Sequence, residues 1–409
     1  MNKLSYLEKL LDGVEVEWLT AAEIFNIKNG YTPSKAKKEF WEDGNIPWFR
    51  LEDIRTNGRE LNDSIMHVNQ AGVKGNLFPK DSIFMSTTAT IGEFALVKIP
   101  HLTNQQITNF SLTSRFKGII DIRYLFHRFH HFGEWCKENA NKSGGLSIIG
   151  IKKLSSYKFP IPCPDNPEKS LAIQSEIVRI LDKFTALTAE LTAELNMRKK
   201  QYNYYRDQLL SFKDGEVEWK TLGEVAQYSK TRISFELLDE RNYVGVDNLL
   251  QNRAGKSLSN HVPTSGKLTE FIPNDILIGN IRPYLKKIWQ ADCIGGTNGD
   301  VLVIRCIDSS INTRYLYQIL ADDKFFEYNM QHAKGAKMPR GSKEDIMKYP
   351  IPVPPLTLQA RIVEILNKFD TLTNSITEGL PREIELRQKQ YEYYRDLLFS
   401  FPKPETASN

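Results

Sequence analysis

One sequence motif occurs twice in this chain, in the same internal order and far apart. Residues 177–184 read IVRILDKF and residues 201–212 read QYNYYRDQLLSF, while residues 362–369 read IVEILNKF and residues 390–401 read QYEYYRDLLFSF. A proline-rich segment precedes each copy, KFPIPCP from Lys158 and KYPIPVP from Lys348. A motif repeated in fixed order over such a distance indicates duplication of a whole structural unit. The sequence therefore predicts two related halves with a pseudo-two-fold internal repeat.

Both copies of the motif have the apolar spacing of a long helix. In the first copy, apolar residues recur at steps of three and four from Ile173 to Phe212, which predicts one helix of about forty residues, roughly 60 Å long. The second copy repeats this spacing from Ile362, but Gly379 and Pro381 interrupt it. Because a proline inside a helix removes a hydrogen bond and clashes with the preceding turn, we expect a kink or a restart there. Two such helices most simply pack together as a coiled-coil pair.

The first helix contains a tandem four-residue unit, TAELTAEL from Thr188. The distance from IVRILDKF to QYNYYRD is four residues shorter than the matching distance in the second copy. Four residues are about one helical turn, so units of this kind can lengthen or shorten a helix without changing its ends. The pattern predicts a helical spacer of adjustable length.

The segments between the helical motifs share a skeleton but differ in most polar positions. VEVEWLTAAE near Glu15 matches EVEWKTLGE from Glu216, LTNQQ from Leu102 resembles GTNGD from Gly296, and IRYLFH from Ile122 parallels TRYLYQ from Thr313. Short β-branched runs separated by Gly, Asn and Pro predict strands, and an amphipathic helix is expected late in each segment. The fold class expected is α+β, with two mixed α/β domains and two long helices. The predicted boundaries are 1–158 for the first domain with a short N-terminal helical segment, 159–214 for the first helical region, 215–348 for the second domain and 349–409 for the second helical region.

Charge, cysteine content and hydropathy set further limits. A formal net charge of +4 in 409 residues permits local basic patches but does not demand a polyanionic partner. The four cysteines form no CxxC pair, so they are expected to be reduced, mostly buried thiols. The N-terminal residues lack the apolar core of a signal peptide, and no stretch is long enough to span a bilayer. A soluble, cytoplasmic protein without a membrane partner is expected.

Motifs for catalysis are missing from the sequence. It contains no GxGxxG, GxxxxGK[ST], HExxH or GxSxG pattern and no NPPY-like tetrapeptide for adenine methylation. PDNPEK from Pro164 has some likeness to a nuclease carboxylate–lysine cluster, but its compressed, proline-rich spacing favours a connector. His127, His130 and His131 lie beside phenylalanines on a predicted helix, which favours packing over metal binding. No catalytic residue, no metal ligand and no bound cofactor are expected in this chain.

Binding loops are better represented than catalytic motifs. The loop KNGYTPSKAKKEFW from Lys28 combines hydroxyls, lysines and aromatic residues, and the glycine-rich basic segments NKSGGLS from Asn141 and AKGAKMPRGSK from Ala333 occupy matching places in the two halves. Such loops bring amides, hydroxyls and cations to phosphates and base edges, and Arg282 in GNIRPYLKK is suited to a bidentate contact with guanine. The competing interpretations are solvated surface loops and, for Arg282, a structural ion pair. The residues predicted to bind DNA are Thr32, Ser34, Lys35, Lys37, Arg50, Thr87, Thr88, Thr90, Lys142 and Gly144 in the first domain, and Arg232, Arg282, Tyr284, Lys286, Lys287, Lys334, Lys337 and Arg340 in the second.

The PIPxP segments, the IVxILxKF helices, the TAEL repeat and the QYxYYRDxLLSF endings together resemble the specificity subunits of type I restriction–modification systems, especially the IC subfamily. The resemblance covers the whole chain. It implies two target-recognition domains that each read half of a bipartite site in double-stranded DNA, held apart by an antiparallel helical spacer. It also implies docking of two modification (methyltransferase) subunits on that spacer, with restriction/translocase subunits joining them, and S-adenosylmethionine, Mg and ATP bound by those partners. The docking residues predicted on the repeated motif are Tyr202, Tyr205, Arg206, Tyr391, Tyr394 and Arg395.

Two other functions remain as alternatives at this point. A self-contained methyltransferase or nuclease would need the cofactor and metal motifs that the sequence lacks. A coiled-coil scaffold without a role on DNA would bind genuine and scrambled sites equally, whereas a recognition protein shows a sequence preference that survives raised salt.

Overall fold

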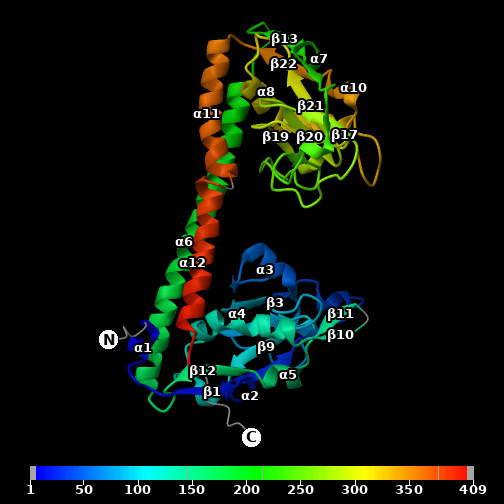
Figure 1. Ribbon diagram of the computed structural model, residues 1–409. Helices are drawn as coiled ribbons and strands as arrows, with labels where there is room; N and C mark the ends of the chain where they lie inside the picture. The colour runs from blue at the N-terminus through cyan, green and yellow to red at the C-terminus, as the bar shows by residue number, and fades with distance from the viewer. Residues whose placement is uncertain (1–5, 144, 214, 376, 403–409) are drawn as a thin grey trace, which may run out of the picture. The chain divides into compact units, whose positions relative to one another are not determined.

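The computed structural model describes residues 6–143, 145–213, 215–375 and 377–402. The chain divides into two compact units (Figure 1): unit 1 is Met1–Ala186 with Lys389–Asn409, and unit 2 is Leu187–Gln388. Each unit contains one of the divergent segments folded as a mixed α/β domain, together with parts of the long helices. The mixed α/β character predicted from the sequence is thus confirmed.

The domain of unit 1 is built around a five-stranded sheet in the order β2-β9-β6-β7-β4, with a three-stranded sheet β5-β3-β8 beside it. Its first and last strands pair with each other, β1 with β12, so that the domain begins and ends at one place. Its elements are α1 (Tyr6–Leu11), β1 (Val16–Thr20), α2 (Ala21–Ile24), β2 (Phe25–Asn29), β3 (Ile46–Phe49), α3 (Leu51–Asn57), β4 (Glu60–Leu61), β5 (Met66–Val68), β6 (Ser82–Ser86), β7 (Phe94–Val97), β8 (Leu102–Thr103), β9 (Ile107–Leu112), α4 (Ile122–Glu138), β10 (Asn141–Ser143), β11 (Leu146–Ile148), α5 (Ile151–Ser155) and β12 (Lys158–Pro162).

The domain of unit 2 repeats this plan. The sheet β14-β21-β18-β19 corresponds to β2-β9-β6-β7, the parallel pair β16–β20 corresponds to β3–β8, and β13 pairs with β22 as β1 pairs with β12. Its elements are β13 (Glu218–Thr221), α7 (Leu222–Val225), β14 (Ala226–Tyr228), β15 (Arg232–Ser234), β16 (Tyr243–Val244), β17 (Lys267–Phe271), β18 (Ile276–Gly279), β19 (Ile288–Gln290), β20 (Gly295–Thr297), β21 (Val301–Cys306), α8 (Thr313–Leu320), α9 (Asp323–Gln331), α10 (Lys343–Ile346) and β22 (Pro350–Val353).

Short sequence motifs repeated in the two halves make the same local contacts. TAAE and TLGE each form a capping box, in which Thr20 pairs with Glu23 and Thr221 pairs with Glu224. The buried tyrosine of each RYL motif donates a hydrogen bond to a proline carbonyl of the closing strand. Tyr124 donates to Pro160 at 2.6 Å, and Tyr315 donates to Pro352 at 3.1 Å. These bonds fasten the late helix of each domain to its closing strand.

The helices that follow the two domains differ as the sequence predicts. Helix α6 (Pro167–Leu210) is continuous over 44 residues, whereas the second helical region is divided into α11 (Leu356–Asn374) and α12 (Gly379–Leu398). Gly379 has a φ of +80°, and a Cβ at this position would lie 2.4 Å from the carbonyl oxygen of Thr371. The helix therefore restarts at a residue that has to be glycine.

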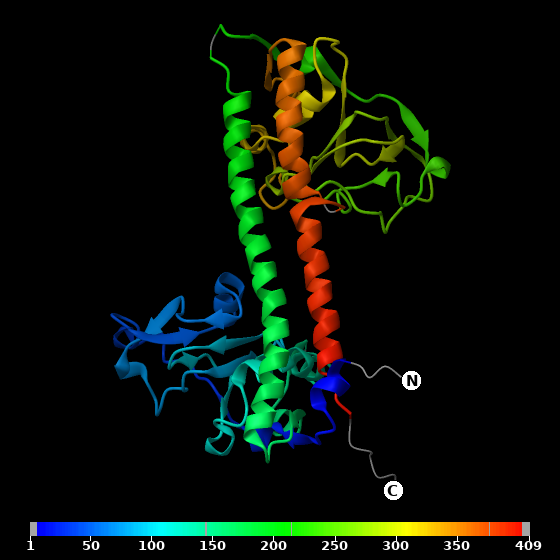
Figure 2. The same ribbon diagram turned by 90° about the vertical axis from the view of Figure 1, so that its left-hand side faces the viewer.

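Within each unit the helices pack through stacked aromatic rings. In unit 1 the rings of Phe184 on α6 and Tyr394 on α12 are 5.2 Å apart and nearly parallel. In unit 2, Tyr202 on α6 stacks on Phe369 of α11 at 5.8 Å, and Figure 2 shows these two helices side by side. The four cysteines are free thiols. No helix in the described part of the chain is long and apolar enough to cross a membrane.

Candidate nucleic-acid interface

Four loops that are distant in sequence meet at one edge of the unit 1 domain. Gly30 N and Tyr31 N donate to the carbonyls of Ile107 and Thr103, both at 2.9 Å, and Thr87 N donates to the Gln106 carbonyl at 2.9 Å. Ala89 N then donates to the Ser147 carbonyl at 2.8 Å. We call residues 29–37, 86–90, 104–106, 141–143 and 145–149 the first loop surface. Backbone bonds between its members hold polar side chains from four sequence segments together.

The unit 2 domain brings the corresponding loops together. Arg282 N donates to the Pro339 carbonyl at 2.8 Å, and Asn280 N donates to the Asp300 carbonyl at 2.8 Å. The guanidinium of Arg340 lies 2.5 Å from the Asp300 carboxylate. We call residues 279–287, 298–300 and 334–341 the second loop surface. The three segments of the second surface share the backbone bonds of residues 86–90, 104–106 and 145–149 of the first surface, while the side chains differ almost throughout.

Most of the residues predicted to bind DNA lie on these two surfaces with exposed side chains. They are Ser34, Lys35, Lys37, Thr90 and Lys142 in unit 1, and Arg282, Tyr284, Lys334, Lys337 and Arg340 in unit 2. Arg282 has a left-handed backbone, with a φ of +53°, which the neighbouring loop stabilises. Gly144 lies outside the described residues. Arg232 is exposed on β15, outside the segments that define the second loop surface, and it contacts Thr269.

Other predicted DNA-binding residues are engaged inside the protein. Thr87 is buried and its hydroxyl lies 2.9 Å from that of Thr108. Lys287 is only 8% exposed and its ammonium donates to the Val246 carbonyl; burial lowers its pKa below the ordinary value. For these two side chains the structure provides packing roles instead of access to a ligand, because their polar groups are already satisfied.

Four further predicted residues have partners but remain partly accessible. Lys286 forms an ion pair with Asp323 at 2.6 Å, so its ammonium has a partner within the protein. Arg50 pairs with Glu52 at 2.7 Å and lies over the Trp48 ring. Thr32 donates to the Gln105 side chain, and Thr88 forms a β-bridge with Ile148.

Several residues of the loop surfaces were not predicted. Gln105 is exposed and Gln106 half-buried on the first surface, within the LTNQQ stretch that matches GTNGD of the second half. The match between these two stretches could have identified Gln105 and Gln106 from the sequence. The exposure of Leu146 and Ile148 could not be predicted from the sequence, because alternating apolar residues in a strand usually lie in a core.

The repeated tyrosine motif has a buried, an exposed and a half-exposed member in both copies. The first tyrosines, Tyr202 and Tyr391, are buried. The second, Tyr204 and Tyr393, are 61% and 65% exposed, and were not among the predicted docking residues. The predicted third tyrosines, Tyr205 and Tyr394, are each 39% exposed. Of the predicted arginines, Arg206 is buried and donates to the Ala321 carbonyl at 3.2 Å, and Arg395 pairs with Asp396 at 2.8 Å.

The buried tyrosines mark a polar junction between each domain and its helices. In unit 1, His127 contacts the Tyr391 hydroxyl at 3.0 Å and the Asp182 carboxylate at 2.8 Å, and Arg123 pairs with the same carboxylate. Burial raises the pKa of Asp182, but hydrogen bonds from His127 and Arg123 outweigh burial and bring this pKa to about 2. These contacts give His127 a structural role at the junction.

In unit 2 two neutral amides replace the His127–Asp182 pair, next to an ion pair between Arg314 and Asp370. The Gln318 amide donates to the Asn367 side-chain oxygen at 3.3 Å and the Tyr202 hydroxyl donates to Gln318 at 3.1 Å. Arg314 binds both Asn367 and Asp370 at 2.7 Å. The same position in the fold is therefore titratable in unit 1 and amide-paired in unit 2.

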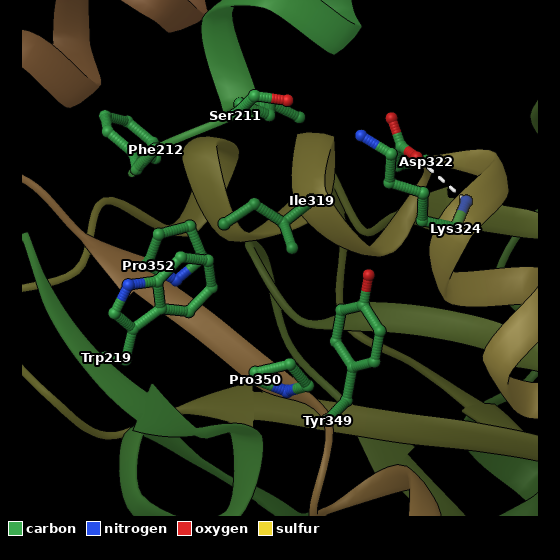
Figure 3. A pocket seen from close by; sticks show the side chains of 10 residues that line it. Ser211, Phe212, Trp219, Ile319, Asp322, Lys324, Tyr349, Pro350 and Pro352 are labelled. Atoms are coloured by element: carbon green, nitrogen blue, oxygen red, sulfur yellow. Dashed lines mark hydrogen bonds between the residues drawn. The ribbon is translucent and has the colours of Figure 1, made fainter. Parts of the chain in front are cut away.

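A cavity of about 290 Å³ lies in unit 2 (Figure 3). Leu210, Phe212 and Trp219 form part of its wall, and Tyr349 points into it from the closing segment. At the position matching Leu210, unit 1 has the buried Phe399, whose ring lies 5.2 Å from that of Tyr124. The smaller leucine accounts for part of the open space. Among the described residues no three His, Cys, Asp or Glu side chains are placed to hold a metal ion.

The chain matches known proteins along its whole length. The family described as "Type I restriction modification DNA specificity domain" matches residues 14–198 and 215–386. The chain is 43% identical over 405 residues to the type I restriction enzyme EcoprrI specificity subunit of Escherichia coli, covering 92% of this chain and 93% of that relative. It is 41% identical over 422 residues to the EcoR124I/EcoR124II specificity subunit of Escherichia coli, with all of both chains covered.

Solved structures show the same fold. A crystal structure of a type I restriction–modification system S subunit from M. genitalium superposes with a TM-score of 0.56 at 15% identity, covering 98% of this chain and 99% of the other. A chain from a structural study of type I R-M complex assembly and conformational transition superposes with a TM-score of 0.52. On the strength of the two matched domains and the full-length relatives, the chain belongs to the specificity subunits of type I restriction–modification systems, and its role is sequence specificity on DNA rather than catalysis.

Proposed function

We propose that each loop surface reads one half of a bipartite, asymmetric site in double-stranded DNA. The observation that carries this proposal is the shared backbone plan of the two surfaces combined with their different side chains. A common backbone places loops alike against a duplex, and different side chains select different bases. The exposed cations Lys35, Lys142, Lys334 and Lys337 are suited to phosphates, and Arg282 to a base edge.

The helices serve in this proposal as a spacer and a docking frame. Stacked rings join α6 to α12 in unit 1 and α6 to α11 in unit 2, which supports an antiparallel coiled-coil pair. Two modification subunits dock at the two copies of the tyrosine motif, whose exposed tyrosines are large amphipathic side chains of the kind enriched at interfaces. Restriction/translocase subunits then join this core in the cytoplasm.

The catalytic chemistry belongs to the partner subunits in this proposal. S-adenosylmethionine, Mg and ATP would be bound by them, because the sequence of this chain lacks the motifs for cofactor binding and adenine methylation. A self-contained methyltransferase is the competing function. Incubating the purified chain with S-adenosylmethionine and DNA would reveal methylation under that alternative, and methylation only after addition of the modification subunit under ours.

The decisive experiment maps methylated adenines in a strain that expresses this chain with its modification subunit. The expected result is one bipartite motif with two conserved halves and a constant gap. Purified complex should then prefer that site over scrambled DNA of equal length, and the preference should persist at raised salt, since phosphate contacts alone are lost there. Equal binding to both DNAs would favour a scaffold without sequence recognition.

A further inference from the structure

The hairpin formed by β10 and β11 projects two aliphatic side chains from the first loop surface. Its strands pair antiparallel, with Asn141 opposite Ile148 and Ser143 opposite Leu146. Leu146 and Ile148 are 50% and 46% exposed, although the next residue, Ile149, is buried. Residues two apart in a strand point to the same face. The hairpin therefore presents an apolar pair on one face.

Backbone bonds hold this hairpin in place. Besides the bond from Ala89 to Ser147, Ile149 N donates to the Thr87 carbonyl at 3.0 Å, and Thr88 forms a β-bridge with Ile148. The hairpin is thus an extension of the loop at residues 86–90. A rigid apolar pair binds a ligand at a lower entropic cost than a free loop does.

The charge around the hairpin indicates the class of ligand. Residues 139–164 contain Lys142, Lys152, Lys153 and Lys158 and no aspartate or glutamate. All four lysines are exposed. An apolar pair inside a cationic segment complements a polyanion that also presents apolar groups. Double-stranded DNA has this character in its major groove, where thymine methyl groups lie between the phosphate backbones.

The second loop surface has a similar combination of groups. In the segment 334–340, Met338 is 49% exposed and lies between the cations Lys337 and Arg340. The backbones of Lys334 and Arg340 exchange two hydrogen bonds of 2.9 Å, so this segment is also a closed loop. Both halves therefore expose an apolar side chain in matching segments, Leu146 in the first and Met338 in the second. Single exposed apolar residues occur on the surface of any protein, but a matching pair in two duplicated domains indicates a shared role.

We propose, building on the function proposed above, that the β10–β11 hairpin enters the major groove of the first half-site and that Leu146 and Ile148 contact thymine methyl groups there. A two-stranded ribbon fits the major groove, and apolar contact with the C5-methyl is how proteins distinguish thymine in it. Lys142 lies on the paired strand opposite Ser147, so its side chain points to the other face of the hairpin, from which it would contact a phosphate. Leu146 and Ile148 are thus specificity-determining residues of the first half-site.

The test replaces thymine by uracil, which removes only the C5-methyl group. Once the site is mapped, the complex of the full chain with its modification subunit is titrated with duplexes carrying uracil in the first half-site. We expect binding about fourfold weaker for each contacted methyl that is lost. The double variant Leu146→Ala/Ile148→Ala should bind the thymine duplex as weakly as the uracil duplex, with an unchanged melting temperature. Ile65→Ala, another exposed isoleucine of unit 1 at 44% exposure, is the matched control and should keep the full thymine preference.

Three outcomes would overturn this inference. Equal affinity of the unsubstituted chain for thymine and uracil duplexes would exclude methyl contacts, and so would a thymine preference that survives in the double variant. A loss of affinity of the double variant for every DNA, specific or scrambled, would assign the pair to folding or nonspecific binding. None of these outcomes removes the bipartite preference itself, whereas failure of the proposed function would remove it for both duplexes.

Discussion

His127 Nε2 lies 2.8 Å from Asp182 Oδ1 at the junction of the first recognition domain with its helices, and in the second repeat the same two positions hold Gln318 and Asn367 at 3.3 Å. Duplication has thus produced an ionisable and a neutral version of one contact in a single chain. The neutral version is an internal control for the ionisable one.

The His127–Asp182 contact of unit 1 should lose stability in acid, while the Gln318–Asn367 contact of unit 2 should not. The folded pKa of Asp182 is about 2, below its ordinary value of 3.8, so its contribution is complete above the ordinary value and is lost as pH falls from there towards 2. Asp182→Asn should cost about 1–2 kcal/mol at pH 7 and less near pH 3. Urea denaturation at the two pH values measures this.

The double variant His127→Gln/Asp182→Asn copies the amide pair of unit 2 and should recover part of that loss. Asn367→Ala, the matched change in unit 2, should have a cost that does not depend on pH in this range. An equal cost of Asp182→Asn at both pH values would contradict the assignment of its low pKa to these contacts.

Gly379 should tolerate no side chain. Gly379→Ala places a Cβ at 2.4 Å from the Thr371 carbonyl oxygen at a φ of +80°, so we expect a loss of about 1–3 kcal/mol. Calorimetric melting of the full chain measures it. Gly150→Ala is the control, because a Cβ there meets nothing within 4 Å and its φ is −85°. Similar melting temperatures for the two variants would show that the helix restart adapts.

Arg282 and Lys286 should behave differently although both were predicted to bind DNA. Arg282→Ala should weaken recognition of the second half-site about 10-fold or more and leave the first unchanged, because its exposed side chain is suited to a base edge. Lys286→Ala should mainly reduce stability, since its ammonium is paired with Asp323. Competition binding with duplexes altered in one half-site separates the two effects. Arg241→Ala, an exposed arginine outside the loop surface, should change neither.

The exposed tyrosines should matter for assembly and not for folding. Replacing Tyr204 and Tyr393 by Ser should weaken binding of the modification subunit about 10-fold or more, with an unchanged melting temperature, because these side chains are largely solvent-accessible. Analytical ultracentrifugation of the reconstituted complex measures this. Leu237→Ser, at 68% exposure, is the control. Unchanged assembly of the tyrosine variant would place docking elsewhere on the chain.

The TAEL unit should set the gap between the half-sites. Deleting residues 188–191 removes about one turn from α6, so the methylated motif should keep both halves with a shorter gap. Adenine methylation mapping in cells that carry the deletion reads this directly. A methylation map with the original gap would contradict the spacer interpretation. If the deletion abolishes all methylation, inserting one more TAEL unit is the complementary test, and it should lengthen the gap.

The repeat, the long helices and the interruption near Gly379 could be predicted from the sequence, because helical periodicity and glycine or proline breaks are local properties. The loops that converge could be predicted too, since their residue types suit phosphate contacts. The accessibility of individual side chains in those loops became known from the folded chain alone. Lys287 and Arg206 are buried and hydrogen-bonded inside, whereas Leu146 and Tyr204 are exposed. The exposure of a side chain depends on which distant segments pack against it, and the residue type alone does not determine this.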